Sequence, residues 1–218
     1  MVKQERAART RDALIRSAAE VFDREGFSPA SLVSISSLAG VSNGALHFHF
    51  ATKAGLADAV EEAALARLKA VTEGAPPAGA GGHLQRLIDA THELADAQLD
   101  DVVLRAGFAL SGDVARPRPG GLRDRWRMWV AGTLERAAAA GELRPGVVVR
   151  DVESAVVAAT VGFEVLGFRD AVWLSAATVA RFWRLLLPTV VPAAGLAGLD
   201  AAGPRLVDLD AAASAAGK

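Results

Sequence analysis

The stretch that decides the fold is SLVSISSLAGVSNGALHFHF, residues 31–50. Two short helical patterns meet there at Ala39-Gly40-Val41, and Gly40 can adopt the left-handed backbone of a tight turn. Ser42 stands where the N-cap of the second helix is expected. Four apolar residues are spaced to face one small core: Ile35, Leu38, Val41 and Leu46. The pattern predicts a helix-turn-helix, although by itself it also suits an ordinary helical hairpin.

The bulk composition limits the class of protein. Of 218 residues, 51% are hydrophobic and 22% charged, which is enough to bury a sizeable core. The chain contains no cysteine, so disulfides, thiolate metal sites and cysteine nucleophiles are excluded. We see neither a signal-peptide core nor an apolar run of roughly 18 residues, the length of a membrane span. We therefore expect a cytoplasmic protein that does not contact a membrane.

Charge is distributed unevenly along the chain. The formal net charge is only -1, yet residues 1–55 carry seven basic and five acidic side chains. A basic end on a mildly acidic body is typical of a protein that touches a polyanion with one part only.

Helical periodicity continues along the rest of the chain, and we find no strand alternation and no repeat. We therefore predict an all-α fold of nine or ten helices. The predicted helices after the opening motif cover residues 53–73, 83 onward, 100–110, 122–140, 151–167 and 174–187, with 6–26 before it. A glycine- and proline-rich break at 74–82 predicts a linker, and Pro188 and Pro192 are expected to close the last helix.

The expected organisation has three parts. Residues 1–52 form a three-helix domain that ends in the helix-turn-helix. Residues 53–192 form a helical body, which begins with 53–73 as a connecting helix. Residues 193–218, rich in alanine and glycine, form a weakly structured tail whose end is disordered.

The motif region resembles the TetR family of repressors. The matching segments fall at the family's spacings and cover residues 6–56: Arg11–Phe22, Gly26-Phe27, Ile35, Ala39–Val41, Gly44–Leu46, Phe48–Phe50 and Lys53–Leu56. Three further segments are similar to the γ-butyrolactone receptors of actinomycetes, a group that includes pseudo-receptors: Val2–Ala7, Leu84–Ile88 and Val103–Gly107.

The resemblance implies a DNA-binding transcriptional repressor. It would act as a homodimer on double-stranded operator DNA of pseudo-palindromic sequence and use no cofactor. A small diffusible lactone would release it, with control over antibiotic production or differentiation as the outcome. An enzyme is the weaker alternative, because the sequence shows no catalytic triad spacing, no phosphate-binding glycine loop and no metal cluster.

Several residues are candidates for DNA contact. Phosphate contacts supply affinity, and base-edge contacts supply sequence choice. Lys3, Arg6 and Arg9 suit phosphates or a minor groove, or are only a solvated basic end. Ser31 and Ser42 can cap helices and donate to phosphate, while Asn43 and Gly44 stand at the start of the recognition helix. By the resemblance, the phosphate-contacting positions also include His47, His49 and Lys53.

Two of these positions depart from the family pattern. Relatives usually have lysine at position 43 and tyrosine at position 47, whereas this chain has Asn43 and His47. We expect an altered operator preference and, because a protonated histidine adds charge, binding that strengthens below neutral pH. A helical sensor with weakened DNA binding is the alternative. His47 and His49 are i and i+2 on a helix and lack a third ligand, so we expect no metal site.

Trp126 is the main candidate for ligand binding. In the receptor group, a tryptophan followed by arginine, here Trp126-Arg127, belongs to the ligand pocket, and an indole suits an acyl lactone. On the residues alone, a plain core tryptophan is the more natural interpretation. The other candidate lining residues are Trp129, Leu84, Ile88, Leu104, Phe108 and Phe163. Ala64 and Phe163 replace polar residues that relatives often have, which suggests a pseudo-receptor that answers to an antibiotic instead.

The two late apolar helices suggest a dimer interface. Small residues allow close helix approach: Ala155, Ala158, Ala159, Gly162, Ala176 and Ala177. In the family this pair forms a four-helix bundle with the second subunit; a buried pair in a monomer is the alternative. A ligand beneath Trp126 would swing the connecting helix and change the separation of two DNA-reading heads.

Overall fold

The computed structural model describes residues 2–74, 82–117 and 119–204, with side chains from Gln4 onward. Its regular structure within these ranges is helical throughout, which confirms the all-α prediction. The elements are α1 (Val2–Glu25), α2 (Leu32–Leu38), α3 (Asn43–His49), α4 (Lys53–Glu73), α5 (His83–Asp100), α6 (Val102–Ser111), α7 (Leu122–Ala139), α8 (Val149–Gly167), the 3-10 helix η1 (Ala171–Leu174), α9 (Ala176–Val190) and α10 (Ala193–Leu196). Three parts of the predicted organisation lie outside the described residues: positions 75–81 of the linker predicted at 74–82, the side chain of Lys3, and the tail end at 205–218.

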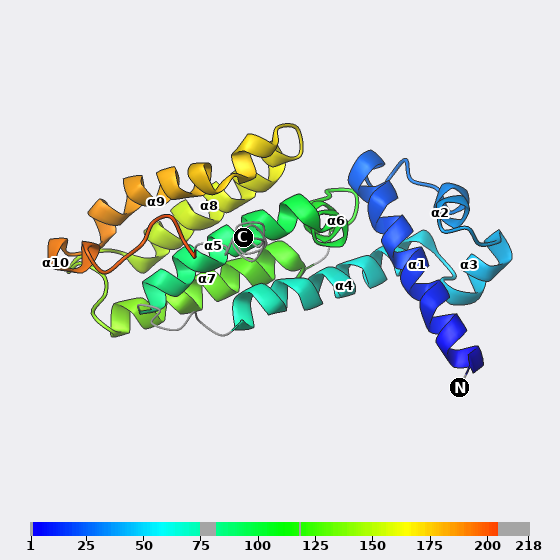
Figure 1. Ribbon diagram of the computed structural model, residues 1–218, viewed down its shortest axis with the longest axis horizontal. Coiled ribbons are helices and arrows are strands. Elements are labelled where there is room, and N and C mark those ends of the chain that lie inside the picture. Colours follow the sequence, from blue (N-terminus) through cyan, green and yellow to red (C-terminus); the bar gives the residue numbers. More distant parts are fainter. Residues whose placement is uncertain (1, 75–81, 118, 205–218) are drawn as a thin grey trace, which may run out of the picture.

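The first three helices form a small head at one end of the molecule (Figure 1). Ser31 Oγ accepts a hydrogen bond from the backbone N–H of Ser34 at 3.0 Å, and Ser42 Oγ accepts one from Ala45 at 3.1 Å. These caps begin α2 and α3, and Gly40, at φ +67°, makes the turn between them. The predicted helix-turn-helix is therefore confirmed.

One residue of the predicted motif core is misplaced. Ile35 and Leu46 are fully buried, and Val41 is half-buried against them. Leu38, however, lies in the last turn of α2 with its side chain exposed to solvent. The head is too small to cover every apolar position of a seven-residue helix, so the prediction that Leu38 faces the core is wrong.

The long helix α4 connects the head to the rest of the protein (Figure 1). Thr52 Oγ1 begins it by accepting from the N–H of Gly55 at 3.0 Å. Along its length α4 packs against α1, α6 and α7. At Gly107 of α6 the approach is so close that a Cβ atom would lie 2.3 Å from Cβ of Ala64. A glycine is required there because the two helices touch through their backbones.

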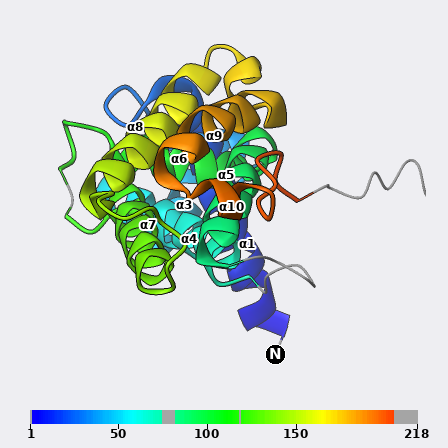
Figure 2. The same cartoon turned by 90° about the vertical axis from the view of Figure 1, so that its left-hand side faces the viewer.

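The body is a bundle in which α8 and α9 lie on one side and α4 on the other, with α5 and α7 between them (Figures 1 and 2). The N-cap of α5 is Gly82, which has no side chain to accept a hydrogen bond from the first turn. Instead, the Glu142 carboxylate, beyond α7, accepts from the N–H groups of His83 and Leu84 at 2.8 and 2.7 Å. Buried apolar side chains form one continuous cluster from α1 to α9.

The end of α9 differs from the prediction. Pro188 does not close the helix, which continues to Val190. Leu187 and Val190 are buried, and packing holds the last turn. Arg144 satisfies two carbonyls there: its N–H donates to Val190 at 2.9 Å and its guanidinium to Pro188 at 3.2 Å. Tertiary contacts thus offset the hydrogen bond that proline removes.

The first part of the expected tail is docked on α5. The N–H of Asp200 donates to Gln85 Oε1 at 2.8 Å, and His92 Nε2 lies 3.1 Å from the carbonyl oxygen of Ala201. Residues 193–204 therefore belong to the folded body. Within the described ranges, no helix combines the length and the hydropathy that a bilayer crossing demands.

Candidate nucleic-acid interface and ligand site

The outer face of α3 presents the predicted DNA-contacting residues together. Asn43, Gly44 and His47 are exposed, and His49 is half-buried beside them. Residues 31–50 contain no acidic side chain, so α2, α3 and the turn between them contribute no negative charge. Ser31 and Ser42 are exposed at the starts of α2 and α3, and Arg9 is exposed on α1. The arrangement offers short donors and bare backbone at the start of one helix, as groove recognition requires.

Lys53 has a different environment from the one expected. Its ammonium donates to the backbone carbonyls of Phe27, Ser28 and Ala30, at 2.8, 2.9 and 2.9 Å. It also lies 4.7 Å from the centroid of the Phe27 ring. An ammonium has three protons, and all three are used here. The phosphate contact expected for Lys53 does not fit this geometry, because the side chain ties the turn after α1 to the start of α4.

Phe48 is a surface feature that the sequence analysis missed as a site. Its side chain is 82% exposed on α3, beside the edge-on ring of His49 at a centroid distance of 5.2 Å. The FHF motif was visible, but a phenylalanine in a short helix suggests core rather than surface. An exposed apolar ring on this face can contact a thymine methyl group.

Trp126 is buried and hydrogen-bonded. It is 1% exposed, and its indole Nε1 donates to Thr160 Oγ1 of α8 at 2.9 Å. Thr160 Oγ1 in turn lies 3.0 Å from the carbonyl oxygen of Val156, to which it donates. The Trp126 ring stacks on Trp129 at 5.3 Å. Thr160 is the partner that sequence reasoning overlooked, since only the fold brings α7 and α8 together.

The other expected pocket residues fall into two groups. Leu84, Ile88, Leu104 and Phe108 are buried in the same core cluster as Trp126. Phe163 instead packs edge-on against Phe182 of α9, at a centroid distance of 6.0 Å. The structure thus places Phe163 in the α8–α9 layer, with Phe182 as its aromatic neighbour.

A second tryptophan has a matching environment. Trp183 of α9 is fully buried, and its Nε1 donates to Thr91 Oγ1 of α5 at 2.7 Å. The Thr91 hydroxyl in turn donates a hydrogen bond to the backbone carbonyl of Ile88, also at 2.7 Å. Each buried indole is thus satisfied by one threonine, as burial of a polar N–H requires.

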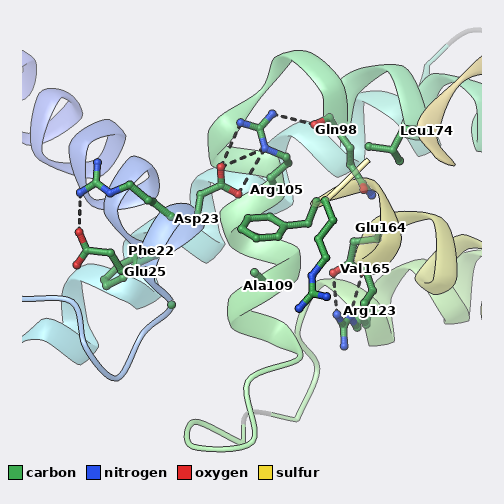
Figure 3. A pocket seen from close by; sticks show the side chains of 14 residues that line it. Phe22, Asp23, Glu25, Gln98, Arg105, Ala109, Arg123, Glu164, Val165 and Leu174 are labelled. Atoms are coloured by element: carbon green, nitrogen blue, oxygen red, sulfur yellow. Dashed lines mark hydrogen bonds and ion pairs between the residues drawn. The ribbon is translucent and has the colours of Figure 1, made fainter. Parts of the chain in front are cut away.

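Two pockets open near these elements. One of about 200 Å³ lies between α4 and α7, and its lining residues are Leu65, Leu68, Lys69, Thr72, Glu73, Arg125 and Trp129. A larger one of about 450 Å³ lies where the end of α1 meets the body (Figure 3). Its wall includes two ion pairs: Arg105 with Asp23 at 3.2 Å and Arg123 with Glu164 at 2.7 Å. Burial raises the pKa of Glu164, although the hydrogen bond from Arg123 opposes the rise.

Metal ligands do not gather in the part of the chain that the structure describes. There, no three histidine or carboxylate side chains come together in a cluster that could hold an ion.

Comparisons with known proteins agree with this architecture. Residues 14–60 match the family described as bacterial regulatory proteins, tetR family. The A-factor receptor protein of Streptomyces griseus is 30% identical over 197 residues, which cover 87% of this chain and 67% of that protein. A crystal structure of a γ-butyrolactone receptor, described as ArpA-like, superposes with a TM-score of 0.76 at 29% identity and covers 90% of this chain and 96% of its own.

A structure of CprB from Streptomyces coelicolor, in complex with its biological operator sequence, is also similar. It has a TM-score of 0.74 and 30% identity, and the match covers 88% of this chain and 93% of that one. The chain belongs to the TetR family of bacterial regulatory proteins and, within it, to the γ-butyrolactone receptor group, whose members are ligand-responsive DNA-binding repressors and not enzymes.

Proposed function

We propose that the protein acts in the cytoplasm as a homodimeric repressor that leaves a pseudo-palindromic operator when a small molecule enters beside Trp126. Each part of the chain has its own role in this proposal. Residues 1–52 read DNA, residues 53–192 bind the effector and the second subunit, and α4 transmits the change. The effector is a γ-butyrolactone-type signal, and the target genes belong to secondary metabolism or differentiation.

The exposed face of α3 supports the DNA-reading role. Asn43 can pair with an adenine edge, and Gly44 lets the backbone approach the bases. Phe48 adds an apolar contact, while His47, His49, Ser42 and the basic side chains of α1 suit phosphates. Asn43 and His47 give this head an operator preference that differs from that of relatives with lysine and tyrosine.

The face formed by α8 and α9 supports dimerisation. Ala158, Ala176 and Ala177 are exposed there, and Leu185 is an exposed large apolar residue on the same pair of helices. Small side chains with an apolar neighbour suit close helix packing against a second copy. Two heads at a fixed spacing are what an operator of two half-sites requires.

The hydrogen bond between Trp126 and Thr160 is the observation that carries the ligand proposal. A ligand carbonyl that accepts from the indole would replace Thr160, and this exchange leaves no buried polar group unpaired. The adjoining pocket of about 200 Å³ is smaller than the roughly 300 Å³ of small-molecule sites. Leu65 and Leu68 of α4 form part of its wall, so a ligand that widens it displaces the helix attached to the head.

The test uses operator release in the full-length dimer. A mobility shift with the gene's own upstream DNA measures binding, and lactones and antibiotics are then titrated. We expect Trp126→Ala to keep operator binding and lose release. Thr160→Val should keep operator binding and release at a lower ligand concentration, because it removes the acceptor that competes with the ligand for the indole. Thr91→Val is the matched control, because it breaks the equivalent bond to Trp183 and should release normally. No DNA binding at low salt would refute the repressor, and normal release by Trp126→Ala would refute the ligand site.

The same titration with lactones and antibiotics also distinguishes a lactone receptor from a second candidate function, a pseudo-receptor. Ala64 is small and apolar, and the described partner of Phe163 is the ring of Phe182, so neither offers a polar contact to a lactone head group. This favours a pseudo-receptor that answers to an antibiotic or its precursor. Release by such a compound, with none by butyrolactones, would select that alternative.

A further inference from the structure

The larger pocket lies at the junction of head and body, and we call it the junction pocket (Figure 3). From the head it is lined by the end of α1, residues 22–26. From the body it is lined by Gln98 of α5, Arg105 and Ala109 of α6, Arg123 of α7, and the C-terminal end of α8 with Leu174 of η1. Neither Trp126 nor Thr160 lines it. Its volume of about 450 Å³ is within the range of small-molecule sites.

The apolar part of the junction pocket is open to solvent. Phe168 is 62% exposed at the end of α8, and Val165 one turn earlier is also exposed. They share the pocket with Phe22 of α1 and Leu174, which are buried. Exposed large apolar side chains beside a concavity mark a surface that another molecule covers.

The charged part of the pocket favours an anion. Its lining includes four arginines and three carboxylates, and each carboxylate is paired with one arginine: Asp23 with Arg105, Glu25 with Arg24, and Glu164 with Arg123. The fourth cation is Arg169, whose side chain has no ion pair or hydrogen bond within the described ranges. A ligand carboxylate would therefore find one guanidinium that is not already committed.

The wall of the pocket is also the mechanical link between head and body. Arg105 pairs with Asp23 of α1 and donates to the carbonyls of Gln98 and Leu99 at 2.9 Å each. One guanidinium thus joins α1, α5 and α6. A molecule that touches both α1 and α8 is bound most tightly when the head keeps this orientation. Its binding must then change the equilibrium between head orientations.

We propose that the junction pocket is a second small-molecule site, separate from the Trp126 site, for an amphiphilic carboxylate with an apolar chain. Its occupant holds the head in the orientation seen here. Helix α8 carries both sites, since Thr160 faces Trp126 while Glu164 and Val165, one turn later, line the junction pocket. The two ligands are therefore coupled through one helix.

Decanoate is a suitable probe because it joins a carboxylate to an apolar chain. Decanol has a chain of the same length without the charge and serves as the comparison compound. Full-length protein is titrated with each compound, and binding is measured by calorimetry. We expect saturable binding of decanoate that is at least fivefold tighter than that of decanol. Arg169→Ala should weaken decanoate by roughly fivefold, the worth of a partly exposed charged pair, and leave decanol unchanged. Arg150→Ala, an exposed arginine at the other end of α8, is the control and should have no effect.

Further variants separate the two sites. Phe168→Ser should weaken both decanoate and decanol, whereas Thr160→Val should weaken neither. A change of decanoate affinity in Thr160→Val with none in Arg169→Ala would place the probe at Trp126 and overturn the proposal. Absence of saturable binding, which would include closure of the pocket by a second subunit, would also overturn it.

The effect on DNA is tested in a separate step. Saturating decanoate should change the operator affinity of the wild type by at least threefold and leave that of Arg169→Ala unchanged. This step rests on the proposed function, but the binding titration does not. A protein that binds decanoate and no DNA would refute the repressor and keep the site, whereas equal operator affinity with and without decanoate would refute the coupling.

Discussion

At the scale of single residues, the environment of Lys53 decides between two roles. A basic residue at the start of α4 suits a phosphate, yet its ammonium is surrounded by three carbonyls of the turn after α1. If Lys53 were removed, each of these three carbonyls would lose a charged hydrogen-bond donor. The side chain therefore stabilises the fold of the head.

We predict that Lys53→Met lowers the free energy of unfolding by about 2 kcal/mol, the size of a hydrogen bond to a charged group. Urea denaturation measures it, and Lys69→Met, which removes an exposed lysine of the same helix, should be near neutral. A phosphate contact would instead reduce the dependence of log K on log salt by about one, so a reduced slope with unchanged stability would contradict the structural role.

Asp89 of α5 illustrates a cost of burial. Its carboxylate is buried and accepts from Gln85 Nε2 at 2.7 Å. Burial raises its pKa, with the Gln85 hydrogen bond and the charges of Arg86 and His92 opposing the rise. The folded state therefore binds this proton more tightly than the unfolded state. The stabilisation is complete below the ordinary pKa and is lost as pH rises through the raised value.

We expect Asp89→Asn to be more stable relative to wild type at pH 7.5 than at pH 4.5, because the neutral amide avoids the cost of burying a charge. Denaturation midpoints at the two pH values measure the difference. Asp100→Asn, at the exposed end of α5, is the control. An equal difference at both pH values would show that ionisation of Asp89 does not contribute to stability.

At the scale of elements, the close crossing of α4 and α6 joins the connecting helix to the body. The helices meet through Gly107 and Ala64, with no room for an added Cβ. Such a contact resists small displacements because every shift of one backbone moves the other.

Gly107→Ala is therefore predicted to destabilise the protein by about 1–3 kcal/mol, the usual cost of overpacking a core. Ala64→Gly should restore part of the loss in the double variant, since it removes the opposing Cβ atom. A double-mutant cycle by thermal denaturation measures the coupling. Strict additivity of the two changes would mean that the two atoms do not meet.

At the scale of the whole molecule, the α8–α9 face is the proposed contact with a second copy. Leu185 is 77% exposed on this face. Val114, in the loop between α6 and α7, is 95% exposed and belongs to neither of these two helices.

We expect Leu185→Glu to convert the dimer to a monomer in sedimentation velocity and to abolish tight operator binding, because a buried unpaired carboxylate opposes association. Val114→Glu should remain a dimer with unchanged operator affinity. A Leu185→Glu protein that sediments as a dimer would exclude this face from the interface.

The sequence by itself determined the helices and the helix-turn-helix, because caps, turn glycines and apolar periodicity act over a few residues. Ser31, Ser42 and Gly40 do what their local chemistry predicts. The tertiary structure alone decided the exposure of Phe48 and the partner of Trp126. It also decided the ion pair between Asp23 and Arg105, which are 82 residues apart. These three features depend on which helices pack together, and a local sequence pattern does not show which distant residues will be in contact.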